Sequence, residues 1–226
     1  MSVNIDFTGR DALLVGAGKV GRRKLADLLK AGARVAVAEP APCRCLVGLA
    51  GTGAIALFPE FSESLLDCGP WVFIALDDPE RARGLAGLAR GRGLMVEVAG
   101  SPSDGNFQSP ALVDFPPLRL TVSTGGASPA LSARVAAELR ERYAGSGALA
   151  AMLGRLRPLV AAGIPSDSGR GLVYKTLAGD PDLAWLYRDL AAGGAGLSAT
   201  DLAARIRSLL ERRLAPLELP PDFPLP

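Results

Sequence analysis

The sequence predicts an α/β protein with a doubly wound parallel sheet, followed by an all-helical C-terminal region. Short apolar runs alternate with amphipathic stretches as far as residue 98, a pattern typical of parallel strands joined by helices. A glycine-rich turn follows the first apolar run, and no strand pattern occurs after residue 145. We therefore divide the chain into a sheet domain (residues 1–113), a connecting segment (114–145) and a helical region with a proline-rich tail (146–226).

The N-terminal residues have the pattern of a strand, a helix and a second strand. The apolar run at residues 12–15 ends at Gly16, and residues 19–30 place leucines at helical spacing among charges. Gly32 ends that stretch, and residues 34–38 (RVAVA) give the second strand. A unit of this kind, roughly thirty residues long, has parallel strands because its helix crosses back over the sheet.

Further apolar runs continue the sheet. Strands are expected at 54–58, 71–75 and 94–98, and helices at 62–68 and 79–92. The last of these strands is followed by a loop rich in Gly, Ser, Pro and Asp, at residues 100–108. Doubly wound sheets bind ligands beyond the carboxyl ends of their strands, so this loop is expected to contribute to a ligand site.

The remaining sequence begins with one more strand and then becomes helical. Residues 118–122 (LRLTV) alternate as a strand should, and the turn STGGASP leads into a helix at 129–143, where a serine cap precedes a proline. Helices are expected beyond it at 149–160, 171–177, 182–190 and 200–214. The final PLELPPDFPLP is too rich in proline to be helical.

The composition excludes several classes of protein. The chain of 226 residues has 25 Lys and Arg against 23 Asp and Glu, so its net charge of +2 gives no field suited to nucleic acid or an anionic membrane. It has no apolar stretch long enough to span a membrane, and its first apolar run is too short for the core of a signal peptide. We expect a protein that binds neither nucleic acid nor membrane.

Cysteine and histidine usage narrows the chemistry. Cys43, Cys45 and Cys68 make an odd count without zinc-type spacing, which predicts free thiols in a reducing compartment and hence a cytoplasmic protein. The chain has no histidine, so proton transfer falls to Asp, Glu, Lys, Tyr, Cys or water. No metal site is predicted.

The turn after the first strand carries the pattern GxGxxG. Gly16 permits the tight turn, Gly18 lets the backbone approach a pyrophosphate, and Gly21 lets helix and strand pack closely. Because the pattern lies between a strand and a helix, it predicts a Rossmann-type fold with a bound dinucleotide. The alternative is a turn of this kind that serves only the fold.

An acidic residue follows the second strand. Glu39 lies 18 residues after Gly21, where a carboxylate that binds the ribose 2′-hydroxyl is expected, and it favours NAD because it would repel the 2′-phosphate of NADP. Arg44 is close in sequence and would favour NADP instead. The alternative for Glu39 is a solvated loop charge.

Four segments resemble one known family. They are GAGKVGRRKLADLLKAGARVAV at 16–37, ALDDPE at 75–80, FQSPALV at 107–113 and VSTGGASPALSARVAAELRE at 122–141. In this order they resemble the precorrin-2 dehydrogenase family, which includes the first domain of multifunctional sirohaem synthases. The resemblance covers roughly residues 5–145, and its most particular string is STGGASPALS.

The resemblance implies a homodimer that oxidises precorrin-2, a tetrapyrrole, to sirohydrochlorin with NAD as hydride acceptor. Some members also insert ferrous iron. Dimerisation would involve residues 114–145, with an apolar helical face of Leu131, Val135, Ala136 and Leu139. The positions that match cofactor-binding residues are Gly16, Gly18, Lys19, Val20, Gly21, Glu39, Pro40, Ala41, Ala75, Leu76 and Asp77. The positions that match substrate-binding residues are Asn106, Ser123, Thr124, Gly125, Gly126 and Ser128.

One loop departs from the family pattern. Better-known members carry an Asn-Val-Val-Asp string whose aspartate handles protons, and here that aspartate falls on Gly100 and the asparagine on Glu97. Asp104 is the candidate catalytic carboxylate in its place, and the alternative is that Asp104 only caps a turn with Gly105. Metal insertion requires removal of inner N–H protons, so we expect chelatase activity to be poor or absent.

A tetrapyrrole substrate is rich in carboxylates, so its site needs hydrogen-bond donors. The candidate donors are Arg22, Arg23, Lys24, Arg119, Arg134 and the backbone N–H groups of residues 124–127.

Two other functions are alternatives to precorrin-2 dehydrogenation. A non-catalytic protein that senses a dinucleotide or binds a tetrapyrrole is the main alternative. A hydroxy-acid dehydrogenase is disfavoured, because such enzymes use a Lys or His to move the alcohol proton.

Overall fold

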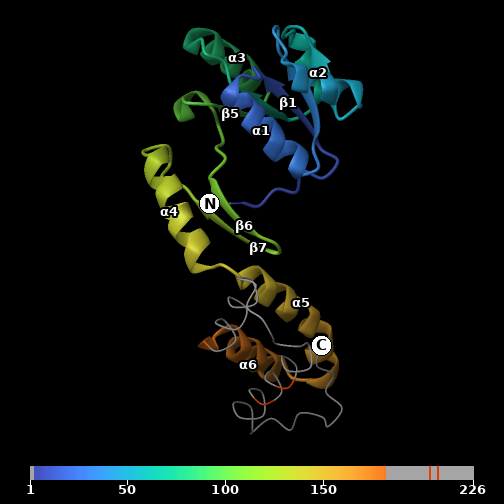
Figure 1. Ribbon diagram of the computed structural model, residues 1–226, viewed down its shortest axis with the longest axis vertical. Helices are drawn as coiled ribbons and strands as arrows, with labels where there is room; N and C mark the ends of the chain where they lie inside the picture. The colour runs from blue at the N-terminus through green and yellow to red at the C-terminus, as the bar shows by residue number, and fades with distance from the viewer. Residues whose placement is uncertain (1–2, 182–203, 205–207, 209–226) are drawn as a thin grey trace. The chain divides into compact units, whose positions relative to one another are not determined.

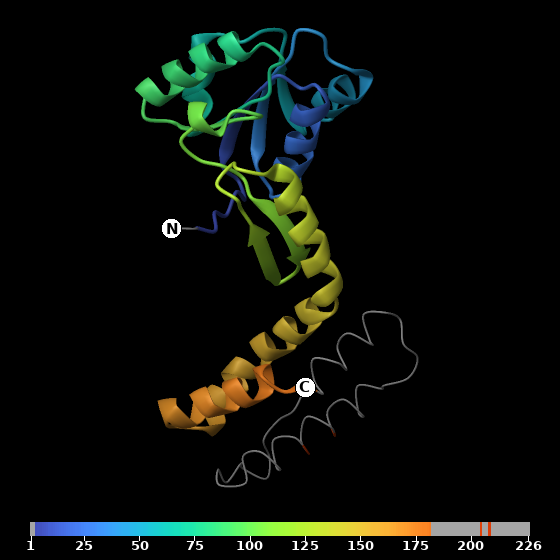
Figure 2. The same ribbon diagram turned by 90° about the vertical axis from the view of Figure 1, so that its left-hand side faces the viewer.

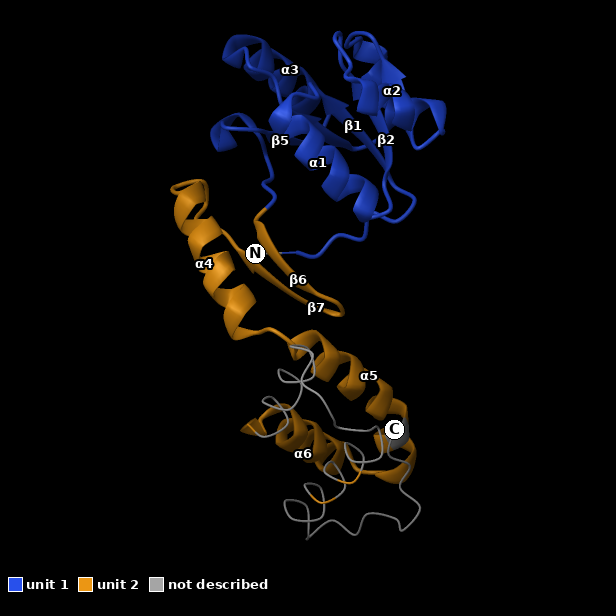
Figure 3. Cartoon of the chain, in the orientation of Figure 1, with its two compact units in different colours: residues 1–109 blue, residues 110–226 orange. Residues whose placement is uncertain are grey.

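The computed structural model describes residues 3–181, 204 and 208. The chain divides into two compact units, Met1–Ser109 and Pro110–Pro226 (Figures 1 and 3). Two of the expected helices, at 182–190 and 200–214, and the proline-rich tail lie outside the described residues or almost wholly so.

The first unit is built on a five-stranded parallel sheet with the strand order β3-β2-β1-β4-β5. The order reverses between β1 and β4, which is the place where open α/β sheets bind their ligands. Each predicted strand of the sheet is confirmed, with ends that differ by no more than one residue. The strands are β1 (Asp11–Val15), β2 (Arg34–Ala38), β3 (Ile55–Phe58), β4 (Trp71–Ile74) and β5 (Met95–Val98).

Helices cover both faces of this sheet (Figure 2). One apolar layer, with Leu14, Leu25 and Leu46, lies between the sheet and the helices α1 and α2. The other, with Leu13 and Ala86, lies under α3. The layers separate because successive residues of a strand point to opposite faces. The helices are α1 (Lys19–Lys30), α2 (Arg44–Gly51) and α3 (Pro79–Gly91), with short 3₁₀ helices η1 (Glu63–Cys68) and η2 (Pro102–Asp104).

Two elements of this unit differ from the sequence prediction. The sequence did not predict α2, because the helix is only eight residues long (RCLVGLAG) and two of them are glycines. Burial of Leu46, which is 1% exposed, stabilises the helix through tertiary packing. The expected helix at 62–68 is present as the 3₁₀ helix η1.

The prediction of free thiols is wrong for two of the three cysteines. Cys43 and Cys45 form a disulfide at the N-terminus of α2, and Cys68 is free. The start of the helix brings the two Cα atoms to 5.4 Å, within the range that a disulfide requires. Sequence spacing alone gave no sign of this, because it depends on where the unpredicted helix begins.

The second unit starts with an antiparallel hairpin, β6 (Ala111–Phe115) and β7 (Leu118–Val122). The sequence predicted β7 but not β6, which is short, follows a proline and contains a charged residue, so the expected boundary at residue 113 falls inside this strand. The hairpin turn contains the cis peptide bond Pro116–Pro117.

Three helices follow the hairpin within the described residues. Ser132 and Ala136 of α4 (Pro129–Arg142) are buried, and α4 packs on both strands. Met152 and Leu156 of α5 (Ser146–Gly163) and Val173 of α6 (Asp167–Ala178) are also fully buried. In the part of the chain that is described, no helix combines the length and the apolar character needed to cross a membrane.

Candidate functional site

Two glycines of the turn between β1 and α1 are required by the fold. Gly16 has a φ of +88°, and a Cβ there would overlap the carbonyl oxygen of Ala75. A Cβ on Gly21 would overlap the carbonyl oxygen of Gly16. Gly16 therefore makes the tight turn and Gly21 lets α1 lie close against the turn, as the sequence predicts.

Gly18 differs from these two because the fold does not require a glycine there. It is the N-cap of α1 with a φ of −61°, and a Cβ on it would meet no atom within 4 Å. Gly18 is exposed together with Lys19 and Val20. The open space beside its backbone is available to a ligand, and that is where the fingerprint places a pyrophosphate.

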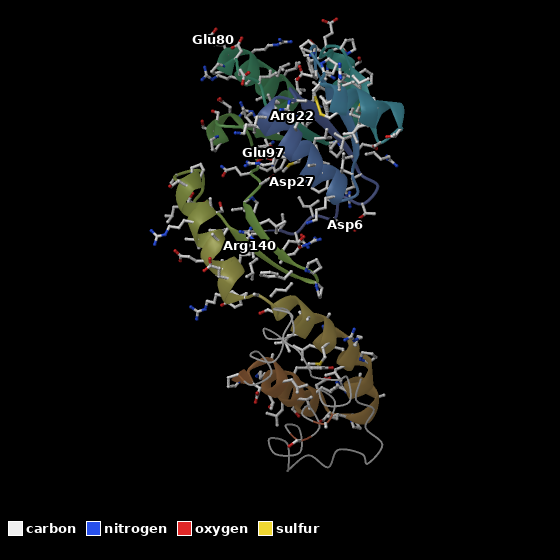
Figure 4. All side chains as sticks on the ribbon, in the orientation of Figure 1. Asp6, Arg22, Asp27, Glu80, Glu97 and Arg140 are labelled. Carbon is white, nitrogen blue, oxygen red and sulfur yellow. A yellow bond between two sulfur atoms is a disulfide. The ribbon has the colours of Figure 1, made fainter. Side chains whose placement is uncertain are left out.

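The N-terminus of α1 is open to an anion. No side chain caps it and its first turn has no acidic residue, whereas Asp78 caps α3 by accepting from the backbone N–H groups of Glu80 and Arg81. The first N–H groups of a helix have no partner within the helix and carry a partial positive charge. Arg22, labelled in Figure 4, lies on the second turn and donates to the carbonyl oxygen of Ala17. A diphosphate fits these donors.

Glu39 is fastened to the glycine turn. One oxygen of its carboxylate accepts from the backbone N–H of Ala17 at 2.6 Å, and the other accepts from the N–H of Ala41 at 3.0 Å. The carboxylate thus lies beside the turn and is not a free loop charge. Each oxygen has a further lone pair, so the group can also accept from ribose hydroxyls. Pro40 and Ala41 are exposed next to it.

The end of β4 lies at the same edge of the sheet. The N–H of Ala75 donates to the carbonyl oxygen of Val15 at 2.8 Å, which brings this residue against the glycine turn. Leu76 is half-buried and Asp77 is exposed. The structure therefore brings the predicted cofactor residues from three strand ends together at the point where the strand order reverses.

Asp104, the predicted catalytic carboxylate, accepts hydrogen bonds from two neighbouring side chains. It accepts from the Ser101 hydroxyl at 2.7 Å and from Nε of Arg83 at 3.4 Å. The Ser101 hydrogen bond and the nearby Arg83 guanidinium hold the pKa of the Asp104 carboxyl below its ordinary value. Asp104 is therefore ionised at neutral pH, and it is a weaker base than an ordinary aspartate.

Gly100 stands where the resemblance places the family's aspartate. Its φ of +80° lies in the left-handed region, which favours glycine. A Cβ there would meet nothing within 4 Å, so backbone conformation and not space limits the residue at this position.

Asn106, predicted to bind substrate, has its side chain on the edge of the sheet. Its Oδ1 accepts from the backbone N–H of Val96 at 2.6 Å, and its Nδ2 donates to the carbonyl oxygen of Leu94 at 2.8 Å. The amide therefore pairs with backbone groups at the start of β5 and just before it, as an additional strand would. A role in substrate binding remains a prediction for this residue.

The other predicted substrate residues form one turn in the second unit. Gly125 and Gly126 have φ values of +62° and +88°. The Thr124 hydroxyl accepts from the backbone N–H of Ser128, and the Ser128 hydroxyl caps α4 by accepting from the N–H of Leu131. The Ser123 hydroxyl accepts from the N–H of Gly125 and remains exposed. The sequence thus predicted residues that gather at the N-terminus of α4.

Most of the basic residues considered as donors already have acidic partners. Their ion pairs are Lys24 with Glu97, Arg119 with Asp114 and Arg134 with Glu138. Arg23 is exposed on α1. The sequence missed the pair of Lys24 and Glu97 because only tertiary structure joins α1 to β5. In the described residues, no group of three or more His, Cys, Asp or Glu is placed to hold a metal ion.

Comparison with known proteins supports a dinucleotide-binding fold for the first unit. A family model described as "Putative NAD(P)-binding" matches residues 3–111, which span the sheet and its glycine turn. The solved structure of SirC, precorrin-2 dehydrogenase, has a TM-score of 0.70 and 23% identity, and the match covers 95% of this chain and 99% of that one. The first unit therefore has a nicotinamide dinucleotide-binding fold.

The sequence relatives are siroheme synthases. Siroheme synthase 1 of Halorhodospira halophila is 35% identical over 166 residues, which cover 72% of this chain and 34% of that protein. Siroheme synthase of Thioalkalivibrio sulfidiphilus is 34% identical over 174 residues, which cover 76% of this chain and 36% of that protein. The chain spans about a third of the length of these curated relatives. The chain is therefore similar in sequence to about a third of these siroheme synthases and similar in fold to a solved precorrin-2 dehydrogenase, as the resemblance to that family predicts.

Proposed function

We propose that this protein is an NAD-dependent dehydrogenase that oxidises precorrin-2 to sirohydrochlorin. The observation that carries the proposal is the open N-terminus of α1 at Gly18, next to the carboxylate of Glu39. The substrate loses a hydride to the nicotinamide and a proton to a base or to water. The direct test is NADH formation when the purified protein receives precorrin-2 and NAD. A protein that binds NAD but forms no NADH would instead be the non-catalytic sensor or carrier.

The cofactor half of the reaction depends on binding and orientation. The N–H groups at the start of α1 would hold the pyrophosphate, and Glu39 would accept from the adenine ribose and disfavour a 2′-phosphate. We therefore propose NAD rather than NADP. Residues 75–77 follow β4 at the same edge and would lie beside the nicotinamide half. When bound, NAD accepts the hydride, so most of the protein's contribution is positioning.

The substrate half would use the turn before α4. Its exposed Ser123 hydroxyl can donate a hydrogen bond, and the N-terminus of α4 favours an anionic group, because Pro129 begins a helix without acidic residues in its first turn. These donors suit a peripheral carboxylate of a tetrapyrrole. We propose that Ser123, Thr124, Gly125, Gly126 and Ser128 form this part of the site.

The Asp104→Ala variant is expected to slow NADH formation by less than about tenfold. A general base typically contributes a factor of roughly 10² to 10⁴, but the lowered pKa of Asp104 makes it a weak base and water can take the proton. Steady-state rates with precorrin-2 and NAD measure the effect. A loss of about 10² or more with unchanged NAD affinity would instead show that Asp104 is the base.

The Asp104→Ala variant also tests whether the protein inserts ferrous iron. Since Gly100 supplies no carboxylate and Asp104 is held by Ser101 and Arg83, iron insertion into sirohydrochlorin should be slow in wild type. Sirohaem absorbance under anaerobic conditions measures it. Rapid iron insertion by both wild type and Asp104→Ala would reveal a different proton acceptor.

We also propose that the protein is a homodimer formed through the hairpin and α4. Leu112 on β6 and Leu131 on α4 are 47% and 49% exposed, and an isolated two-stranded sheet is only marginally stable. Ala136 packs inside the unit, so only part of the predicted apolar face is available to a partner.

Leu131→Asp is expected to shift the protein from dimer to monomer at micromolar concentration. A charge in a dimer interface would be desolvated without a partner, which costs several kcal/mol. Light scattering measures the mass, with Val47→Asp as the control because Val47 is similarly exposed but lies on α2 in the other unit. A monomeric wild type would contradict the proposal.

A further inference from the structure

Lys24 and Glu97 form a partly buried ion pair between α1 and β5. Nζ of Lys24 lies 2.9 Å from a carboxylate oxygen of Glu97, and the two side chains are only 22% and 15% exposed. The Lys24 ammonium also lies over the face of the Phe73 ring, 5.4 Å from its centre, where the π-electrons attract a cation. Glu97 is labelled in Figure 4. Val96 and Val98 point into the apolar layer under α3, so Glu97 points to the α1 face.

The same carboxylate holds the last residue of the first unit. One oxygen of Glu97 accepts from the backbone N–H of Ser109 at 3.0 Å, and the other accepts from the Ser109 hydroxyl at 2.7 Å as well as from Lys24. Glu97 therefore joins three parts of the chain: the helix that starts at the glycine turn, the edge strand, and the point where the connection to the second unit begins.

The segment before Ser109 is fixed by contacts that do not involve Glu97. The N–H of Asn106 donates to the carbonyl oxygen of Val96 at 2.9 Å. The ring of Phe107 packs edge-on against Phe73 and Trp71, with centroids 5.5 Å apart in each case. Glu97 is thus the group that fixes the end of this segment, while backbone pairing and ring packing fix its start.

Packing alone does not explain a charged pair at this place. Burying two charges costs solvation free energy, and apolar side chains of the same size serve stability as well or better. What only an acceptor can do here is bind both donors of Ser109. The pair therefore defines one course for the chain after the loop that carries Asp104, and it ties that course to α1.

We propose that Glu97 is a positioning residue for hydride transfer, acting with Lys24 through Ser109. It sets the path of residues 106–109, which follow the loop that carries Asp104, with respect to the helix that would bind the cofactor. This inference rests on the proposed dehydrogenase function. Glu97 touches neither substrate nor cofactor in this role, so its loss affects the tetrapyrrole reaction and leaves dinucleotide binding unchanged.

The test compares Glu97→Ala with Asp11→Asn. Asp11 forms an ion pair with Arg34 in the same unit, but that pair is exposed (43% and 69%) and holds no loop, so it is the matched control. In Glu97→Ala, amide hydrogen exchange at Ser109 should be faster by roughly tenfold or more, because a bond to a charged acceptor is lost. Exchange at Asn106 should not change, and the NAD dissociation constant should stay within about twofold, in line with a role outside the cofactor site.

Kinetics separate positioning from plain stabilisation. With precorrin-2, Glu97→Ala should lower kcat by about tenfold or more at saturating NAD, as misplacement of reacting groups does, with no change in the KM for NAD. Glu97→Gln keeps one acceptor for Ser109 and should recover part of the loss. Asp11→Asn should behave as wild type.

Each result bears on the proposal. Two results in Glu97→Ala would overturn the positioning role while leaving the dehydrogenase function in place. One is an unchanged rate of amide hydrogen exchange at Ser109, and the other is faster exchange at Ser109 together with a wild-type kcat. A weaker NAD affinity in Glu97→Ala would show a cofactor-binding role instead. If wild type forms no NADH from precorrin-2, the proposed function fails and this inference fails with it.

Discussion

Gly18→Asp is expected to abolish dinucleotide binding without harming the fold. The backbone of Gly18 has a φ of −61°, which any residue adopts, and its Cβ would lie in open space. Aspartate is also a good N-cap, so its carboxylate would accept from the first N–H groups of α1 and stabilise the helix by roughly a few tenths of a kcal/mol relative to glycine. The new side chain would thereby occupy the donors that the pyrophosphate needs and repel its charge.

Calorimetry with NAD and thermal unfolding together measure this effect. We expect NAD affinity to fall by about 10² or more, because a charge-assisted site is lost, and Tm to stay the same or rise by about a degree. NADH formation from precorrin-2 should vanish with it. An unchanged NAD affinity in Gly18→Asp would show that the pyrophosphate does not bind at this turn.

Two further glycine variants, Gly18→Ala and Gly21→Ala, serve as controls for the loss of NAD binding in Gly18→Asp. Gly18→Ala adds a Cβ without charge, and it separates steric exclusion from electrostatic exclusion. In Gly21→Ala the new Cβ would overlap the carbonyl oxygen of Gly16, so the helix must shift and the protein should lose stability. A fingerprint that served only the fold would make Gly18 as intolerant as Gly21, and the open space at Gly18 argues against that.

The parts of the fold that sequence predicts well are those fixed by local pattern. Strand β2 (Arg34–Ala38) and strand β7 (Leu118–Val122) have the predicted ends, since alternation and flanking glycines or turns define them. The three glycines of the fingerprint were also predictable, because their roles follow from a strand, a turn and a helix adjacent in sequence.

The parts that sequence missed depend on tertiary contacts. Helix α2 is held by the burial of Leu46, and strand β6 is defined by its pairing with β7. Likewise the pair of Lys24 and Glu97 joins residues that are 73 positions apart. Propensity and periodicity carry no information about such contacts, and for this reason the predicted sheet was correct while several side-chain roles were not visible.

Asp104 shows the same limit at a single residue. The sequence offered two interpretations, a catalytic carboxylate or a turn cap, and both rest on the residue type and its neighbours. The structure adds Arg83 from α3, 21 positions away, and with Ser101 this neighbour lowers the pKa of the Asp104 carboxyl. Whether an aspartate is a strong or a weak base depends on such partners, which a linear sequence does not reveal.

Glu39→Gln is expected to remove the preference for NAD over NADP. The wild-type carboxylate lies beside the glycine turn, where it would accept from the ribose hydroxyls of NAD and repel a 2′-phosphate. Glutamine keeps one acceptor oxygen for the N–H of Ala17 but loses the charge and the second acceptor.

We expect NAD affinity of Glu39→Gln to fall by roughly tenfold or more, because hydrogen bonds to a charged acceptor are among the stronger ones, and stability to fall by only about 1 kcal/mol. NADP affinity should rise, since the repulsion is gone and the exposed Arg44 on α2 is free to approach the 2′-phosphate. Calorimetry with both dinucleotides measures the ratio of NAD affinity to NADP affinity.

Glu60→Gln is the matched control, because Glu60 is an exposed carboxylate that follows the neighbouring strand β3. This variant should leave both affinities unchanged. A Glu39→Gln protein that still prefers NAD by the wild-type ratio would show that selectivity arises elsewhere, and the ribose would then have to bind away from the end of β2.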